Sequence, residues 1–299
     1  MSFGVEVRDL VVRYGQTTAL DRVSVTLPSG SITGLIGRNG SGKTSLLSAL
    51  AAFRKADAGT VLVDGEDPWE NDRVLAGVCL VRESGDVLTD WSLRDNLRYA
   101  EQSREHFSPE LASRLMDVFE LPAKRKPAQL SRGKKSAFGV VIGLAARADL
   151  TLLDEVHLGM DAPSRYAFSD ALLADYVEHP RTIVISSHLI EEMQRLVERV
   201  VVLHEGQVLL AEETDVLRGR GTSVTGPADA VERFTSGRTV IGRQTLGRAA
   251  QATVYGAVDG TDRAAARGLG LDLGPVDLQD LFVHLTGPTG LAVTQEVQR

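Results

Sequence analysis

The stretch GRNGSGKT, residues 37–44, has the spacing G-x-x-x-x-G-K-T, which is typical of a loop that binds nucleotide phosphates. Glycines let consecutive backbone N–H groups converge on the phosphates, and a following helix adds the positive end of its dipole. We predict that Lys43 contacts the β- and γ-phosphates and that the Thr44 hydroxyl binds Mg²⁺. The alternative is a glycine-rich turn without a ligand. The predicted phosphate contacts are Gly37, Arg38, Asn39, Gly40, Ser41, Gly42, Lys43, Thr44 and Ser45.

Two acidic residues and a histidine follow predicted buried strands. The segment LTLLDE, residues 150–155, is an apolar strand that ends in Asp154 and Glu155. Beside a phosphate loop, Asp154 is suited to bind the hydration shell of the metal, and Glu155 to polarise the attacking water. His188 follows the strand TIVISS, which we expect to end at the same edge of the sheet. We therefore predict that His188 contacts the γ-phosphate, the alternative being a histidine that only caps a strand.

Two further positions are candidates for binding parts of a nucleotide. The ring of Tyr14 is suited to stack on a base, unless it is an ordinary aromatic at the rim of the sheet. The segment QLSRGKKSAF, residues 129–138, presents Ser131 and Gly133 at a predicted helix start, where unpaired backbone N–H groups attract an anion. The chain therefore contains a second predicted anion site, far from the phosphate loop in sequence.

These residues need a sheet whose strands end at one edge, and the hydrophobic pattern predicts one. Residues 3–14 and 21–27 alternate like half-buried strands, and a β-rich run over 31–37 precedes a helix that begins at Thr44. Strands and helices then alternate along the chain, which implies an α/β core. The predicted elements are helices 92–102, 108–121, 131–148, 164–179 and 189–198, strands 149–155 and 181–188, and a hairpin over 199–210.

The composition changes after about residue 217. Residues 218–227, RGRGTSVTGP, are glycine-rich and resemble a linker, and the rest reads as a small α+β unit. We expect this accessory domain to make a dimer contact or to regulate the first domain, the alternative being a stabilising appendage. Its predicted elements are strands 222–225, 238–243, 251–258 and 269–273 and helices 227–236, 261–267 and 277–286.

Charge and composition exclude several classes of protein. The 299 residues carry a net charge of −7, which argues against a nucleic-acid partner held by general electrostatics. The basic run 124–126 is interpreted as a solvated face. The single cysteine, Cys79, excludes a disulfide within the chain and fits a reducing compartment. No apolar run approaches the eighteen or so residues of a membrane-spanning helix.

Taken together, Tyr14, GRNGSGKT, LSRGKKS, LLDE, LGMD and SSH resemble the nucleotide-binding subunit of an ATP-binding cassette (ABC) transporter. The resemblance covers roughly residues 3–217. It implies an ABC ATPase fold over residues 1–217, with a mixed-sheet core and a helical subdomain at about 84–145, followed by the accessory domain 218–299. Residues 180–209 resemble ABC-2 type exporters, and residues 143–173 and 278–287 are similar to their Ytr-type subgroup.

The resemblance implies a head-to-tail dimer that sandwiches ATP and Mg²⁺. In such a dimer Ser131, Arg132, Gly133 and Asp161 would contact nucleotide held by the second ATPase subunit, which is either a second copy of the chain or a related one. The implied catalytic residues are Glu155, His188 and Lys43, and the implied metal ligands are Thr44, Asp154 and Glu83.

Four residues depart from the usual family pattern, and one of them is Val156, which stands where proline is usual after the acidic pair. Glu83 stands where glutamine is common, Arg132 replaces the first glycine of the signature, and Lys134 replaces its glutamine. Because Gly133 is retained, we expect the signature still to approach a phosphate.

The favoured function is the ATP-hydrolysing subunit of a bacterial exporter, bound to the cytoplasmic face of the membrane through a separate integral membrane permease. Residues 83–99 are expected to dock that permease, and no nucleic acid is expected. One alternative is a soluble ABC ATPase that acts on nucleic acid or ribosomes, and another is a regulatory module that binds nucleotide without turnover. The transported substrate is not predicted by this chain.

Overall fold

The computed structural model describes residues 2–83, 86–256 and 258–286. The chain forms two compact units. The first comprises residues up to 188 together with 195–211, and the second comprises residues 189–194 together with those from 212 onward. The division in the structure thus lies near residue 212, whereas the sequence predicted residue 217, and the short segment 189–194 belongs to the second unit.

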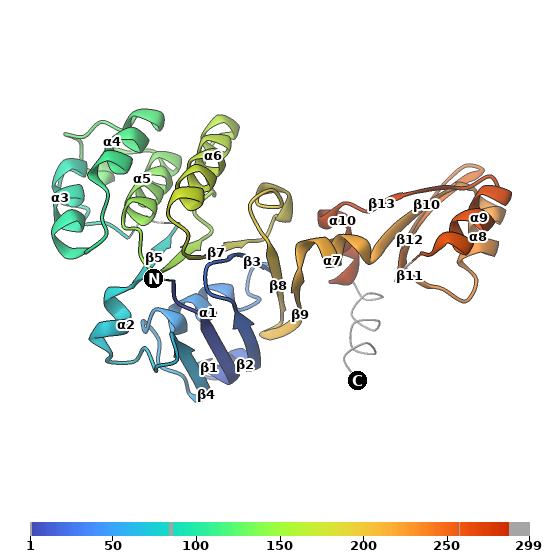
Figure 1. Ribbon diagram of the computed structural model, residues 1–299, viewed down its shortest axis with the longest axis horizontal. Coiled ribbons are helices and arrows are strands. Elements are labelled where there is room, and N and C mark those ends of the chain that lie inside the picture. The colour runs from blue at the N-terminus through green and yellow to red at the C-terminus, as the bar shows by residue number, and fades with distance from the viewer. Residues whose placement is uncertain (1, 84–85, 257, 287–299) are drawn as a thin grey trace. The chain divides into compact units, whose positions relative to one another are not determined.

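The first unit is built on a six-stranded sheet, counted over the described residues, in the order β5-β6-β7-β3-β8-β9 (Figure 1). The strands from β5 to β8 are parallel. Every residue of β3, β6 and β7 is buried, which explains why these strands read as almost continuous apolar runs. The strands are β3 (Ile32–Ile36), β5 (Val78–Arg82), β6 (Leu150–Asp154), β7 (Thr182–Ser187), β8 (Arg199–His204) and β9 (Gln207–Glu213).

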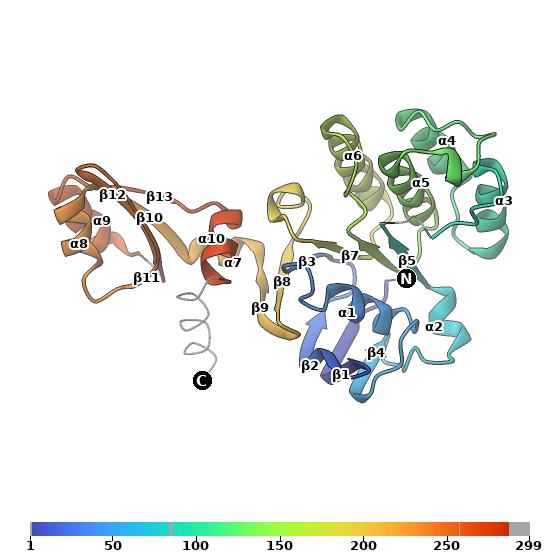
Figure 2. The ribbon, with the colours of Figure 1, turned by 180° about the vertical axis from the view of Figure 1, so that it is seen from behind.

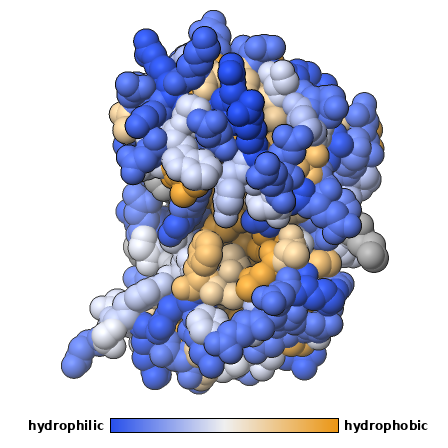
Figure 3. All heavy atoms as spheres, turned by 90° about the vertical axis from the view of Figure 1, so that its left-hand side faces the viewer, coloured by the Kyte–Doolittle hydropathy of each residue, from blue (hydrophilic) through white to orange (hydrophobic). Residues whose placement is uncertain are grey.

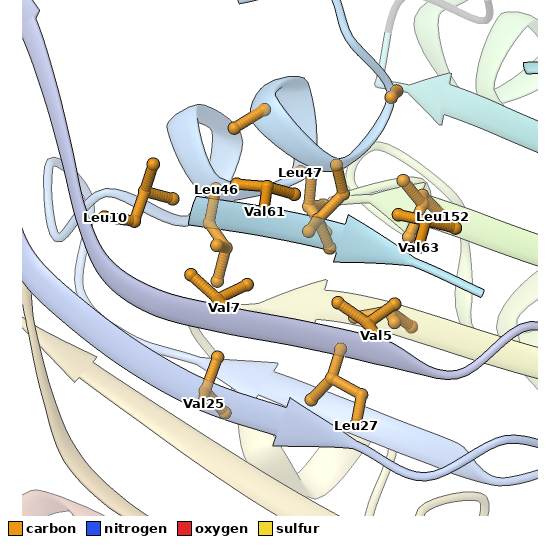
Figure 4. Close-up of a cluster of buried hydrophobic side chains, with 14 of the residues drawn as sticks. Val5, Val7, Leu10, Val25, Leu27, Leu46, Leu47, Val61, Val63 and Leu152 are labelled. Atoms are coloured by element: carbon orange, nitrogen blue, oxygen red, sulfur yellow. The ribbon is translucent and has the colours of Figure 1, made fainter. Parts of the chain in front are cut away.

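A second, antiparallel sheet covers helix α1 (Lys43–Leu50). It contains β1 (Val5–Tyr14), β2 (Thr17–Leu27) and β4 (Ala58–Val63) in the order β2-β1-β4. Side chains that alternate along these strands point inward and pack against α1 and β6, as Figure 4 shows. Val5 and Val7 of β1 lie near Leu27, Leu46 and Leu47 in this core. Apolar packing against this sheet therefore fixes α1, the helix that follows the phosphate loop.

Helices α3 to α6 cluster on the far side of the sheet from this layer (Figure 1). Ser92, Ser108 and Ser131, at which three of the predicted helices start, cap α3, α4 and α5 with their side-chain oxygens. Helix α5 buries Phe138 completely and packs against α4, α6 and β5. These elements are α2 (Asp72–Ala76), α3 (Leu93–Ser103), α4 (Pro109–Val118), the 3₁₀ turn η1 (Pro127–Gln129), α5 (Arg132–Ala145) and α6 (Ala162–Glu178).

The second unit has the order strand-helix-strand-strand-helix-strand with a sheet order β11-β12-β10-β13, which is a ferredoxin-like topology (Figure 2). Its core forms between the sheet and helices α8 and α9. The order of elements predicted for this unit is confirmed. They are α7 (Thr214–Gly219), β10 (Gly221–Pro227), α8 (Ala228–Thr235), β11 (Thr239–Leu246), β12 (Ala249–Tyr255), α9 (Gly260–Gly268), β13 (Asp272–Pro275) and α10 (Leu278–Leu285).

One predicted helix is wrong. Residues 189–198 form only the short 3₁₀ turn η2 (Ile190–Glu192) and irregular turns. Ile190 and Met193 are buried, and the Ile190 N–H donates to the side-chain oxygen of Gln279 at 3.0 Å. Packing of η2 against α10 therefore replaces the helical hydrogen bonds. A smaller difference is that α6 begins at Ala162 with Asp161 as its cap, rather than at residue 164.

Among the helices in residues 2–83, 86–256 and 258–286, none combines the length and the hydropathy that crossing a bilayer requires.

Candidate functional site

The carboxyl ends of three parallel strands meet at one edge of the large sheet. Ile36 of β3 is in register with Ser187 of β7, and Asp154 of β6 is in register with Ser186 of β7. The phosphate loop leaves β3 at this edge, and His188 follows β7 there. Ligand sites of α/β sheets form at such edges because loops from several strands converge on one place.

The phosphate loop has the backbone that its glycines predict. Gly40 and Gly42 have positive φ angles of 82° and 106°. A Cβ atom at Gly42 would lie 2.7 Å from the Ala19 carbonyl oxygen, so a larger residue does not fit there. Helix α1 begins at Lys43, and the first N–H groups of a helix have no partner within it. The Ser41 hydroxyl is buried and has no hydrogen-bond partner within the described chain, so it is available to donate to an anionic ligand.

Two of the side chains predicted to bind the metal lie next to each other. The Thr44 hydroxyl donates to a carboxylate oxygen of Asp154 at 2.7 Å, and the Ser186 hydroxyl donates to the other at 2.5 Å. Asp154 is buried at the end of its strand. A hydroxyl and a carboxylate are hard oxygen ligands, which fit Mg²⁺ bound jointly by protein, water and phosphate.

Glu155 lies between two basic side chains. One of its carboxylate oxygens is 3.2 Å from Lys43 Nζ, and the other is 3.0 Å from His188 Nδ1. Lys43 Nζ also donates to the Gly37 carbonyl at 2.7 Å, so the ammonium group is already held inside the phosphate loop. Glu155 has a φ angle of 52°, an uncommon value for a residue with a side chain. Such strain is often found at functional sites, where the surrounding structure holds it.

His157 was not among the predicted site residues, although it begins the segment HLGMD, residues 157–161, which resembles the family loop that crosses between subunits. Its imidazole is 4% exposed, and its Nε2 atom lies 3.0 Å from the Ser187 hydroxyl and 3.8 Å from Glu155. The residue thus connects the loop after β6 to the end of β7 beside His188. The sequence offered one signal for its importance, namely that it lies three residues after Asp154. That its imidazole is buried next to Glu155 follows only from the fold.

The second predicted anion site forms around the start of α5. Ser131 caps this helix by accepting the Lys134 N–H, and a Cβ atom at Gly133 would lie 2.2 Å from the Gly159 carbonyl oxygen. Asp161 caps α6, and hydrogen bonds from Ser164 lower the pKa of its carboxyl group, so the group stays charged at neutral pH. Ser131, Gly133 and Asp161 all line one hollow of about 440 Å³.

Two basic residues of this segment have partners within the chain. Lys134 Nζ donates to the backbone carbonyls of Phe119 and Glu120 at 3.1 and 3.0 Å, so it anchors the end of α4. Arg132 forms an ion pair with Glu83. The predicted role of Glu83 as a metal ligand remains a prediction, because its carboxylate is directed to Arg132 in this structure.

Tyr14 ends β1 and is half exposed. The guanidinium group of Arg54 lies 5.4 Å from the centre of its ring, a cation–π contact. Its stacking on a base remains a prediction. Within the described ranges, no hydrogen bond or ion pair joins residues 131–133 to the phosphate loop. The structure therefore assembles two separate groups of predicted ligands.

Comparisons with known proteins agree with this geometry. Residues 20–157 match the sequence model of a family described as ABC transporter. The chain is 29% identical over 214 residues to the ABC transporter ATP-binding protein YtrB of Bacillus subtilis, covering 72% of this chain and 73% of that protein. It is also 29% identical to the sulfate/thiosulfate import ATP-binding protein CysA of Mycobacterium bovis, covering 72% of this chain and 63% of that protein.

A solved structure provides an independent comparison of the fold. It is a dimeric ATP-binding cassette in a post-hydrolysis state with ADP and Pi bound. The TM-score is 0.62 at 21% identity, and the alignment covers 70% of this chain and 98% of that one. The predicted fold is thereby confirmed.

We expect His157→Ala to destabilise the protein by about 1–3 kcal/mol, because the substitution removes a buried imidazole together with its contact to the Ser187 hydroxyl. Urea denaturation of the purified protein would measure the change. The matched control is His106→Ala, since His106 is exposed and its loss should change the free energy of unfolding by less than about 0.5 kcal/mol. Equal stability of the two variants would show that the buried imidazole does not support this edge.

Proposed function

We propose that this chain, which carries the ATP-binding domain of the ABC transporter family, hydrolyses ATP to drive a membrane transport complex. The predicted enzyme class, an ABC-family ATPase, is confirmed by the family match, and the coupling to transport is our proposal. The proposal includes a second ATPase subunit and an integral membrane permease in a separate chain. It places the protein peripherally at the cytoplasmic face of the membrane.

One observation carries the dimeric mechanism. The phosphate loop with Asp154 and Glu155 forms one group of ligands, and Ser131, Gly133 and Asp161 form another, with no direct polar contact between residues 131–133 and that loop in the described chain. Both groups expose features that bind anions. Pairing two chains head to tail would complete each site with the second group of the partner. ATP would then stabilise the closed dimer, and its hydrolysis would release it.

The position of Glu155 supports its role as the general base. The ammonium group of Lys43 balances its charge, and His188 contacts the other carboxylate oxygen. When the ammonium group of Lys43 binds the β- and γ-phosphates instead, one oxygen of Glu155 is released to accept a proton from water. His188 remains in contact with the other oxygen and orients the carboxylate. Positioning and charge stabilisation account for most of the catalysis of phosphoryl transfer.

Thr44 and Asp154 are the residues that would hold Mg²⁺. When bound, the ion neutralises charge on the phosphate oxygens. The Ser186 hydroxyl donates to the carboxylate oxygen of Asp154 that does not contact Thr44. This hydrogen bond fixes the side chain, so it does not need to reorient for the metal.

A surface of the first unit fits the proposed permease contact. Figure 3 shows apolar side chains gathered in a hollow on one face of this unit. Trp91 and Tyr99 line a hollow of about 580 Å³ in the same unit. Phe53, Leu88, Trp91 and Tyr99 are large and exposed, and the rings of Trp91 and Tyr99 meet edge to face with centres 6.0 Å apart. Exposed apolar surface of this kind commonly marks a protein interface. We propose that a helix of the permease docks here, which agrees with the expectation for residues 83–99.

We also propose export as the direction of transport. The support is the resemblance of residues 180–209 to ABC-2 exporters. A relative named as an import ATPase is as similar overall as YtrB, so the direction is a separate proposal from ATP hydrolysis.

Glu155→Gln is expected to lower kcat for ATP hydrolysis by about 100- to 10,000-fold, because the general base is lost while the shape of the site is kept. Release of inorganic phosphate would measure it. Glu205→Gln is the matched control, since Glu205 is exposed at the tip of the β8–β9 hairpin and its loss should not change kcat. Unchanged turnover in the Glu155 variant would remove Glu155 as the base.

Mixing two inactive variants tests whether the site is shared. Lys43→Ala disables the phosphate loop of its own chain, and Ser131→Arg disables the segment offered to the partner. Each variant alone should be nearly inactive, and an equimolar mixture should recover up to about one quarter of wild-type ATPase activity, because half of the dimers are mixed and each contains one intact site. No recovery on mixing would contradict the shared site.

Association with a permease separates the transporter from the soluble alternative. We expect the tagged protein to fractionate with membranes in its native host and to lose this association when Trp91 and Tyr99 are both changed to serine. Quantitative blotting of membrane and ribosome fractions would measure it. Val177→Ser is the control, since it removes an exposed apolar residue that does not line the hollow formed by Trp91 and Tyr99. Recovery of the unaltered protein with ribosomes would support the alternative function.

A further inference from the structure

Two charged residues that depart from the family pattern contact each other. Arg132 is the first residue of α5, and Glu83 follows directly after β5. Both Nε and Nη2 of Arg132 face the same carboxylate oxygen of Glu83, so the hydrogen bonds are charge-assisted. The two side chains are 69% and 34% exposed. Ion pairs this exposed contribute little to stability, so the pair invites a functional explanation.

The backbone of Glu83 is held by the same helix. The Ser136 hydroxyl is fully buried and lies 3.1 Å from the carbonyl oxygen of Glu83 and 3.1 Å from that of Leu158. Arg132 and Ser136 are four residues apart, so they lie on the same face of α5. The carbon stem of Arg132 also packs against the backbone at Gly159, where a Cβ atom would lie 3.2 Å from Arg132 Cγ. The arginine is therefore directed to Glu83 by fixed neighbours.

This contact has a consequence for the shared site, and the argument rests on the proposed function. In a head-to-tail dimer the start of α5 faces the phosphates of the nucleotide bound by the other chain. The negative charge of Glu83 neutralises the guanidinium group and would repel those phosphates. The guanidinium group has five N–H donors, and those of Nη1 are not among its hydrogen bonds to Glu83.

We propose that Glu83 is a positioning residue that holds Arg132 within its own chain and withholds its charge from the partner's nucleotide until the dimer closes. Arg132 then exchanges the carboxylate for a phosphate oxygen. Glu83 thus opposes closure when ATP is scarce. This role differs from the metal-ligand role expected from the sequence, and the two roles predict opposite effects of the same substitution.

The test measures ATP-dependent dimerisation of the full chain by sedimentation velocity, in a Glu155→Gln background that prevents turnover. We expect Glu83→Gln to lower the ATP concentration at half-maximal dimerisation by at least about twofold, because Arg132 is free to bind phosphate. The shift should appear both with Mg²⁺ and with EDTA. A metal ligand would give the reverse result, namely weaker dimerisation with Mg²⁺ and no change with EDTA.

Two controls assign the effect to the pair. Glu120→Gln removes the same charge from an ion pair with Lys134 beside the same helix. It should leave the midpoint, the ATP concentration at half-maximal dimerisation, unchanged because Lys134 keeps its carbonyl partners. In an Arg132→Ala background, Glu83→Gln should also have no effect on the midpoint. An unchanged or raised midpoint for Glu83→Gln with Arg132 intact would overturn the proposed role of Glu83 but not the proposed function. A Glu155→Gln parent that never dimerises with ATP would overturn the proposed function as well.

Discussion

A carboxylate that is largely removed from water must be balanced by nearby positive charge, and the candidate site is organised around this requirement at Glu155. Lys43 provides this charge, and His188 contacts the other carboxylate oxygen from a different loop. These loops meet at Glu155 only because the parallel strands end in register at one edge of the sheet. The same arrangement explains a functional order of events. In the proposed function, nucleotide phosphates would compete with Glu155 for Lys43, so substrate binding would change the charge balance of the proposed base.

The same competition between charges recurs at the start of α5. Arg132 is paired with Glu83 in the isolated chain, just as Lys43 is paired with Glu155. In both pairs a basic residue with a predicted phosphate contact is held by a carboxylate of its own chain. The difference lies in burial, since Lys43 and Glu155 are almost enclosed whereas Arg132 is exposed. Exchange should therefore require more reorganisation at the first pair than at the second.

Much of the fold followed from local signals in the sequence. Serine caps marked the starts of α3, α4 and α5, and apolar runs marked the buried strands β6 and β7. The helix expected over 189–198 does not form, because the apolar residues of this segment pack against α10, which is far away in sequence. Local propensity cannot anticipate such a contact, since the energy of burial exceeds the preference for a helix.

By itself, the sequence predicted the phosphate loop, placed the carboxylates after β6 and gave the order of elements from β10 to α10, because glycine, capping and apolar periodicity act over a few residues. Only the tertiary structure decided which charges meet. It placed His157 against Ser187, directed Lys134 to the end of α4 and joined Arg132 to Glu83. These contacts join residues up to 49 positions apart, and their geometry depends on how helices and strands pack.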